Sequence, residues 1–286
     1  VASDHEYGAL DRTWRFLAGK HGFRYINQPI ALPTTSSDEI VDQIWRAVTP
    51  STRVIFLSHI TSPTALILPV EKICRKARRH NILTIIDGAH APGQIGLNLN
   101  SLDADFYIGN LHKWLCAPKG SGFLYAHPRS QNLIEPLIVS WGWQSESPSD
   151  SKFVDYLEWQ GTRDISAFLA VEDAIRFQKD HDWPLQQKRC FDILSQLKQQ
   201  INNITKCDSI CPDLPNWFSQ MAACKLPHGT NITELKTSLY EQYSIEVPVL
   251  LWNTIPLIRI SFQAYNSETD AQALAGALNL LLKKCV

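Results

Sequence analysis

Short apolar runs separated by amphipathic segments constrain the fold of this chain more than any other feature of its sequence. Each run is four to six residues long, and the clearest are residues 53–58, 83–87, 105–108 and 122–126. After Pro69, apolar residues recur at helical spacing as Val70, Ile73, Cys74 and Ala77. Strands that alternate with helices favour a mainly parallel sheet covered on both faces. We therefore predict an α/β fold.

The second half of the chain has a different pattern. Residues 140–160 are rich in Ser, Pro, Asp and aromatic residues and show no helical or strand periodicity. This pattern predicts a long surface loop. Beyond it we expect helices at 167–179, 184–201 and 268–284 and strands near 218–223 and 257–263. We predict a large three-layer domain over residues 1–170 and a smaller α+β domain over residues 171–286.

Composition and charge exclude several classes of protein. The 27 Lys and Arg nearly balance the 28 Asp and Glu, so the chain lacks the basic charge that favours nucleic acid or an anionic membrane surface. No stretch of ~18 apolar residues is present, so no membrane span is expected. The seven cysteines are scattered without zinc-type spacing, and an odd number of thiols fits a reduced, cytoplasmic protein.

The first residues, Val1-Ala2-Ser3-Asp4-His5, contain neither an initiator Met nor the basic and apolar segments of a signal peptide. They have the character of a strand that is entered in the middle of a domain. We therefore expect that a further N-terminal segment belongs to this protein.

Three polar clusters follow predicted strands, at residues 58–62, 87–90 and 109–113. In open α/β sheets, ligands bind beyond the carboxyl ends of the strands. The clusters are therefore candidates for one site.

Asp87 ends an apolar strand, where a carboxylate is costly unless it meets a cation or hydrogen-bond donors. A protonated pyridine nitrogen is one such partner, and pairing with it strengthens an aromatic ring as an electron sink. The alternative is an ordinary helix-capping Asp, which spacing alone favours.

Lys113 also follows a strand end, between His112 and Trp114. A lysine held in a semi-apolar pocket can have a lowered pKa and form an imine with an aldehyde. The alternative is a solvated surface lysine. His112 is a candidate phosphate donor, and its alternative role is that of a partly buried, hydrogen-bonded histidine.

The order of these motifs is more specific than any one of them. A strand ends in Asp87-Gly88-Ala89-His90, the next in Asn110-Leu111-His112-Lys113-Trp114, and Pro118-Lys119-Gly120-Ser121-Gly122 leads into a third. This order resembles the class V aminotransferase family of fold-type I pyridoxal 5'-phosphate (PLP) enzymes, which includes cysteine desulfurases and isopenicillin N epimerase. The resemblance extends from about His5 to the C-terminus and implies the PLP transferase fold.

The resemblance implies a role for each matching residue. Lys113 matches the lysine that binds the cofactor's aldehyde and later moves the Cα proton, and Asp87 matches the partner of the pyridine nitrogen. His90 takes the place of a residue that contacts the phenolic oxygen, where many relatives have Gln. Asn110 and His112 match phosphate ligands.

Four more residues are assigned in the same way. Ser62 lies where desulfurases carry an Asn near the phenolic oxygen, and His5 matches the aromatic residue that stacks on the ring, with Tyr7 as the fallback. Thr162 matches a residue that reaches the phosphate of a neighbouring subunit, which implies a homodimer with a shared active site. Arg259 matches the arginine that binds the substrate's α-carboxylate, a group that suits its planar fork.

The reaction is less constrained than the cofactor. Residues 244–256, where desulfurases carry a nucleophilic cysteine, contain none, which disfavours a persulfide-forming enzyme. Residues 140–143 and 245–261 most resemble isopenicillin N epimerase-like proteins. Epimerisation, transamination and C–S bond elimination all begin with removal of the Cα proton of an amino-acid substrate by Lys113, so all three stay open. A non-catalytic scaffold that kept the fold is the alternative of another class.

Overall fold

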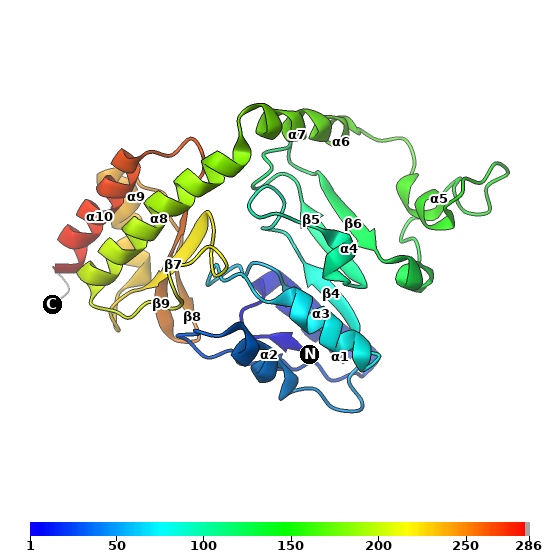
Figure 1. Cartoon of the computed structure of the whole chain (residues 1–286), viewed down its shortest axis with the longest axis horizontal. Helices are drawn as coiled ribbons and strands as arrows, with labels where there is room; N and C mark the ends of the chain where they lie inside the picture. Colours follow the sequence, from blue (N-terminus) through cyan, green and yellow to red (C-terminus); the bar gives the residue numbers. More distant parts are fainter. Residues whose placement is uncertain (284–286) are drawn as a thin grey trace.

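The computed structural model describes residues 1–283, and its larger sheet carries the strands foreseen from the apolar runs (Figure 1). Six strands lie in the order β2-β1-β3-β4-β5-β6, and β1 to β5 are parallel whereas β6 runs antiparallel to β5. Their bounds are β1 Ala2–Ser3, β2 Asn27–Gln28, β3 Val54–Ser58, β4 Leu83–Asp87, β5 Phe106–Asn110 and β6 Gly122–Ala126. The mainly parallel α/β sheet is therefore confirmed.

Helices connect these strands, and a 3-10 helix follows β6. They are α1 Gly8–His21, α2 Ser37–Trp45, α3 Val70–Arg79, α4 Leu99–Leu102 and the 3-10 helix η1 Pro128–Leu133. The four residues of α3 at helical spacing are all buried, and α3 packs against β4 and α4. The side chain of Ser36 accepts a hydrogen bond from the Glu39 amide at the start of α2.

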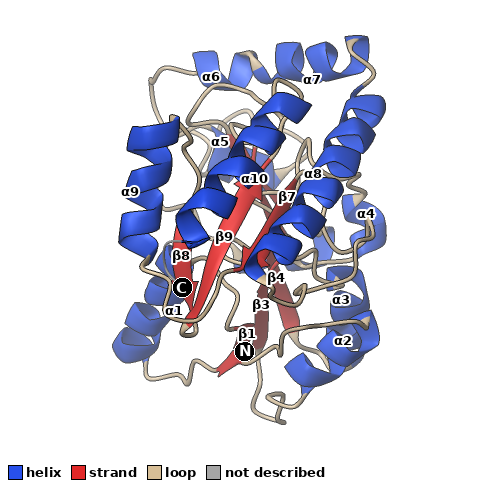
Figure 2. Cartoon of the chain, turned by 90° about the vertical axis from the view of Figure 1, so that its left-hand side faces the viewer, coloured by secondary structure: helices blue, strands red, loops and turns tan. Residues whose placement is uncertain are grey.

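The second half forms a three-stranded antiparallel sheet with helices on it (Figure 2). The sheet order is β7-β9-β8, and α8 packs against β7 and α10. The bounds of these elements are α5 Lys152–Glu158, α6 Ser166–Leu169, α7 Val171–Asp180, α8 Trp183–Thr205, β7 Met221–Lys225, α9 Ile232–Tyr243, β8 Val249–Trp252, β9 Ile255–Ser261 and α10 Glu268–Leu282. The domain boundary at residue 170 stays a prediction, and residue 284 of the expected closing helix lies outside the described residues.

Several local expectations are corrected. Residues 140–160 contain the helix α5, which begins where the Ser151 hydroxyl accepts from the Val154 amide. The helix expected at 167–179 is two helices that meet at Ala170. β8 lies within residues 244–256, for which no strand was predicted, and Asn253 and Thr254, both with positive φ, form a tight hairpin turn into β9. Helices α1 and α9 were not foreseen.

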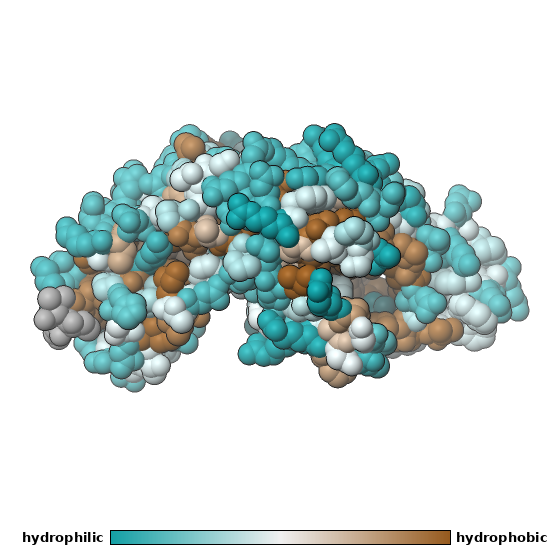
Figure 3. Space-filling view, turned by 90° about the horizontal axis from the view of Figure 1, so that it is seen from below, coloured by the Kyte–Doolittle hydropathy of each residue, from teal (hydrophilic) through white to brown (hydrophobic). Residues whose placement is uncertain are grey.

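The segment around α5 projects from the rest of the molecule (Figure 1). It exposes large apolar side chains, including Leu137, Trp141 and Trp143, and Leu169 is exposed in α6 beyond it. Seen from below, hydrophobic residues lie among hydrophilic ones on the side of the molecule from which this segment projects (Figure 3). We call residues 133–165 the projecting segment.

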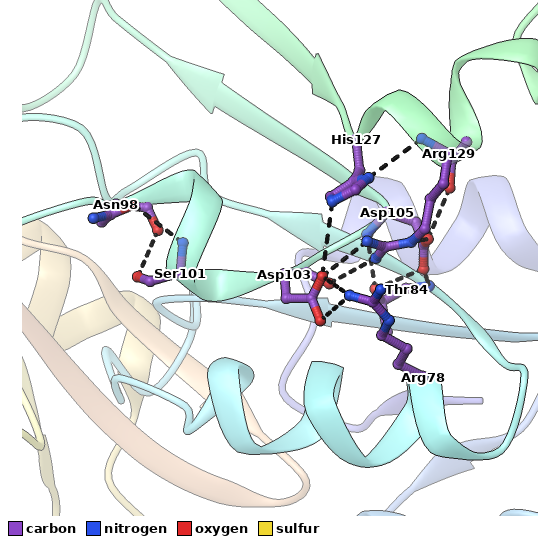
Figure 4. A network of polar contacts seen from close by, with 9 residues as sticks. Arg78, Thr84, Asn98, Ser101, Asp103, Asp105, His127 and Arg129 are labelled. Atoms are coloured by element: carbon purple, nitrogen blue, oxygen red, sulfur yellow. Dashed lines mark hydrogen bonds and ion pairs between the residues drawn. The ribbon is translucent and has the colours of Figure 1, made fainter.

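A polar network lies at the amino ends of β4 and β5 (Figure 4). Arg129 donates from Nε to Asp105 Oδ1 at 2.9 Å and from Nη1 to Asp103 Oδ1 at 2.8 Å. Arg78 also pairs with Asp103, and the Thr84 amide donates to Asp105 Oδ2 at 2.9 Å. The network ties α3, β4, β5 and η1 together at the end of the sheet opposite Asp87.

Candidate active site

The predicted polar clusters meet at the carboxyl edge of the large sheet. Ser58 ends β3 directly opposite Asp87, which ends β4, and Asn110 ends β5. Gly88 follows Asp87 and must lack a side chain, because a Cβ there would lie 2.1 Å from the Tyr107 ring. The parallel register therefore brings together residues that are far apart in the sequence.

Asp87 is a buried carboxylate with few donors. Its side chain is 8% exposed, and its Oδ1 accepts one hydrogen bond, from the Ala89 amide at 2.9 Å. Burial raises the pKa of Asp87, while the Ala89 hydrogen bond and the Lys113 charge partly lower it. A cation or a strong donor at this carboxylate would stabilise its charged form.

Lys113 lies in a tight turn after β5, where the Cys116 amide donates to the Lys113 carbonyl at 3.2 Å. Burial lowers the pKa of Lys113, the Asp87 carboxylate raises it, and the Arg259 guanidinium lowers it; the net result is a pKa below the ordinary value. A larger fraction of this amine is therefore neutral at a given pH than for a surface lysine, which favours nucleophilic attack.

His90 lies in the same cluster. Its Nδ1 is 3.2 Å from the indole Nε1 of Trp114. Burial, together with the charges of Lys113 and Arg259, lowers the pKa of His90 to about 3. His90 is therefore a neutral imidazole at physiological pH.

Arg259 reaches this cluster from β9 of the second sheet. Its Nη1 donates to the Ser62 carbonyl at 2.6 Å and lies 3.3 Å from the Ser62 hydroxyl. Its Nε is buried and has no hydrogen-bond partner among the described residues. Burial lowers the pKa of Arg259. A buried guanidinium with an unused donor has the chemistry to bind a carboxylate in two-point fashion.

Asn110 and His112 lie at the adjoining strand end. Asn110 ends β5 opposite Gly122 of β6. The Nδ1 of His112 is 3.2 Å from the Ser121 carbonyl, which only accepts, so Nδ1 carries a proton. Nε2 of His112 can then donate to a phosphate only when the ring is doubly protonated.

Two predicted residues make no hydrogen bond with this cluster among the described residues. His5 is fully buried, with its ring nitrogens 2.7 Å from Thr64 Oγ1 and 3.0 Å from the Ile30 carbonyl, and it packs against Trp252. The fallback residue for this stacking role, Tyr7, is 52% exposed. Thr162 is exposed on the projecting segment.

One residue near the site escaped the sequence analysis. Glu6 is 7% exposed and accepts hydrogen bonds from the Ser58 amide at 2.8 Å and the Ser58 hydroxyl at 2.6 Å. Burial raises the pKa of Glu6 to about 7, against the lowering effect of its hydrogen bonds with Ser3 and Ser58, and the charge of Asp87 raises it too. No local pattern marks Glu6, because its partner is 52 positions away.

Other kinds of site find no support in residues 1–283. No group of three or more His, Cys, Asp or Glu within that range could hold a metal ion. No helix in the described part of the chain has both the length and the apolar character needed to cross a membrane.

Comparison with known proteins identifies relatives along nearly the whole chain. The family model described as aminotransferase class V matches residues 1–274. Isopenicillin N epimerase of Amycolatopsis lactamdurans is 36% identical over 99% of this chain and 74% of its own length. The protein of the same name from Streptomyces clavuligerus is 35% identical over 98% of this chain and 73% of its own length.

More distant relatives carry other names. A probable chloroplastic L-cysteine desulfhydrase of Arabidopsis thaliana is 26% identical over 99% of this chain and 63% of its own length. Among solved structures, the cysteine desulfurase CsdA from Escherichia coli superposes with a TM-score of 0.80 at 19% identity, covering 99% of this chain and 71% of that chain. The cystine C-S lyase C-DES superposes with a TM-score of 0.78 at 20% identity, covering 97% and 74%. These structural likenesses show the fold.

Proposed function

The chain belongs to the aminotransferase class V family of PLP enzymes, and from this premise we propose that it acts at the α-carbon of an amino acid through a cofactor bound to Lys113. The observation that carries the proposal is that the Lys113 amine and the Asp87 carboxylate lie at the same carboxyl edge of the sheet and within electrostatic range, so that each shifts the pKa of the other. Arg259 lies within electrostatic range of the same lysine.

The residues around Lys113 fit the cofactor's polar groups. PLP, when bound, supplies an aldehyde for a lysine and a ring that withdraws electrons from Cα. Asp87 would accept a hydrogen bond from the protonated ring nitrogen, which would satisfy a carboxylate that now has one amide donor. Asn110 and His112 would hold the phosphate, and His90 would donate to the phenolic oxygen. Stacking of His5 on the ring stays a prediction.

Arg259 would bind the substrate's α-carboxylate. Its orphaned Nε and its Nη2 form a fork that matches the two oxygens of a carboxylate, while Nη1 keeps its bond to Ser62. This anchor would hold Cα within reach of the Lys113 amine. The amine, with its lowered pKa, would then take the Cα proton.

Epimerisation is the outcome we favour, because the relatives at 35–36% identity over almost the whole chain carry the name isopenicillin N epimerase. C–S bond elimination is the second candidate, favoured by the desulfhydrase relative at 26% identity. Elimination here would not use Cys224 as a nucleophile, because burial raises the pKa of that thiol to about 12. Transamination shares the first proton transfer.

We also propose that the chain forms a homodimer in which the projecting segment packs against a second copy. Leu137 and Trp141 are 103% and 85% exposed, and Leu169 is 69% exposed. Monomers rarely leave so much apolar surface in contact with water. In such a dimer Thr162, on the same segment, would reach the partner's phosphate site. A cytoplasmic location is part of the proposal and accords with the six free cysteines among the described residues.

The first experiment adds PLP to the purified protein and then treats it with borohydride. We expect a visible absorbance band and, after reduction and digestion, a cofactor mass on the peptide that carries Lys113. Lys113→Ala should lose both signals. Lys119→Ala is the matched control, because Lys119 is an exposed lysine on the same loop. A protein that takes up no PLP would support the scaffold alternative, and label on another lysine would remove Lys113 from its role.

The second experiment separates the reactions. The PLP-loaded protein is incubated in deuterated water with D and L forms of candidate amino acids and with cysteine and cystine. Deuterium at Cα with inversion and without loss of a side chain supports the epimerase. Release of pyruvate and sulfide supports the lyase.

A further inference from the structure

The indole of Trp114, the residue that follows Lys113, points at His90 rather than into a purely apolar core. Its Nε1 lies 3.2 Å from His90 Nδ1, although 24 positions separate the two residues. Trp114 is 6% exposed. Indole N–H is a donor only, so the facing nitrogen of His90 must be the acceptor.

This contact determines where the single proton of His90 resides. Burial and the neighbouring cations Lys113 and Arg259 lower the pKa of His90 to about 3, so the ring carries one proton at neutral pH. Nδ1 is occupied as an acceptor, so that proton lies on Nε2. Among the described residues, Nε2 has no hydrogen-bond partner of its own.

Both partners of this contact are held by other segments. The Trp114 carbonyl lies 3.0 Å from Nε2 of Gln178 in α7 and 3.5 Å from Nε2 of Gln263, which follows β9. On the other side, Gln94 donates to the His90 carbonyl at 2.7 Å. The indole therefore approaches His90 from a fixed position.

We propose that Trp114 is a positioning residue whose indole N–H holds neutral His90 with Nε2–H as the donor to the cofactor's phenolic oxygen. The inference rests on the proposed function, because it gives His90 a cofactor contact. An amide side chain such as that of Gln at this position would have a donor whose proton does not depend on a tautomer. A histidine can serve as such a donor reliably only if a second residue selects one tautomer and one ring orientation. We assign this role to Trp114.

The first test is histidine NMR on the cofactor-free protein with 15N-labelled histidine. His90 is assigned as the signal lost in His90→Ala. We expect the neutral Nε2–H pattern in the wild type, and in Trp114→Phe a shift of the Nδ1 signal together with a gain of the other tautomer. Trp183→Phe is the matched control: Trp183 is 7% exposed, and its Nε1 donates to the Gly93 carbonyl at 2.9 Å. It should leave the His90 signal unchanged.

The second test follows the visible absorbance of the PLP-loaded protein with pH. A donor at the phenolic oxygen stabilises the negative charge that grows when the lysine–cofactor linkage loses its proton, and so lowers the apparent pKa of that linkage. Weakening the donor in Trp114→Phe should raise this apparent pKa by about half a unit to one unit. In a His90→Ala background the same substitution should cause no further change.

The outcomes separate the two proposals. A wild-type His90 that is doubly protonated or carries its proton on Nδ1 overturns the role of Trp114 even if Trp114→Phe does not fold. The proposal is also overturned if Trp114→Phe changes the apparent pKa of the absorbance equally in the wild type and in the His90→Ala background. Such a result would mean that Trp114 acts through packing. Failure of the wild type to take up PLP overturns the proposed function. In that case, an Nε2–H tautomer of His90 in the wild type would still support the selection of this tautomer by Trp114.

Discussion

The two ends of the six-stranded sheet hold their buried charges in opposite ways. At the amino ends of β4 and β5, Asp103 and Asp105 are paired with Arg78 and Arg129 (Figure 4). Burial raises the pKa of Asp103, but hydrogen bonds and charge from the two arginines outweigh it and leave the pKa below its ordinary value. The charged form of Asp103 is therefore the stable one at this end.

At the carboxyl ends of the same strands the balance is reversed. Burial outweighs pairing, so the pKa values of Asp87 and Glu6 are raised and that of Lys113 is lowered. These groups lie close enough to influence one another, but they do not neutralise one another. The comparison teaches that the ion pairs at the amino ends of the strands stabilise the fold. At the carboxyl ends, the ionisable groups lack full pairing, and a ligand could supply the missing partners.

The largest expected effect comes from Asp87→Asn, which removes the charge at the ligand end and keeps the shape. Turnover of the PLP-loaded protein should fall on the order of 10³-fold, as for the loss of other preorganised electrostatic partners. The unfolding free energy of the cofactor-free protein should stay the same or rise, because the replaced carboxylate has a raised pKa. Steady-state kinetics and urea unfolding measure the two effects, and near-normal turnover would remove Asp87 from its role.

At the amino ends of β4 and β5, a substitution should change mainly the free energy of unfolding. Arg129→Met leaves the carboxylates of Asp103 and Asp105 without their bridging cation and should cost roughly 3–5 kcal/mol of unfolding free energy. Arg176→Met is the control, because its pair with Asp173 is exposed and should be worth about 0.5 kcal/mol. A loss in Arg129→Met no greater than the control's would mean that the network does not stabilise the sheet. Both are measured by urea unfolding.

The pH dependence of stability should have opposite signs at the two ends. Glu6 has a pKa of about 7 when folded against 4.5 as its ordinary value, so the folded state retains a proton that the unfolded state loses between these pH values. Stability should therefore fall by about 3 kcal/mol as pH rises through this window. Asp103, with its lowered pKa, contributes stability that is lost as pH falls below its ordinary range.

Glu6→Gln tests this assignment. It should abolish the decline in stability between about pH 5 and pH 7 while keeping the hydrogen bonds with Ser58. Asp11→Asn, at a carboxylate with a lowered pKa, is the control and should retain the decline. An unchanged slope in Glu6→Gln would show that another group titrates in this window. Urea unfolding at several pH values provides the measurement.

The smallest effect is expected at the contact between the two sheets. Ser62→Ala removes the hydroxyl beside Arg259 but keeps the backbone carbonyl, which has the shorter contact at 2.6 Å. We expect KM for the amino acid to rise about fivefold, which corresponds to about 1 kcal/mol, with little change in kcat. Ser219→Ala is the control, because the Ser219 hydroxyl donates instead to the Gln94 carbonyl. An unchanged KM would mean that the Ser62 hydroxyl does not help to orient Arg259.

Local pattern was sufficient for the parts of the molecule that short segments determine. The bounds of β4 and β6 match the apolar runs, and the buried stripe of α3 matches the helical spacing. Asp87 and Lys113 became candidates because each lies at a strand end and because the order of the motifs around them resembles a known family. The helix α5 was missed, since its seven residues lie in a segment whose composition favours a loop. The hairpin between β8 and β9 was missed because its turn, Asn253-Thr254, lacks the glycine that usually signals one.

The sequence by itself determined the α/β class, the succession of strands β3 to β6 and the two residues proposed to bracket the cofactor. Only the tertiary structure decided that Arg259 meets Ser62 across 197 positions, that Glu6 is buried beneath Ser58 and that Trp114 faces His90. The reason is physical. Periodicity reports which face of an element avoids water, whereas the protonation state of a group depends on burial and on neighbours that distant segments supply.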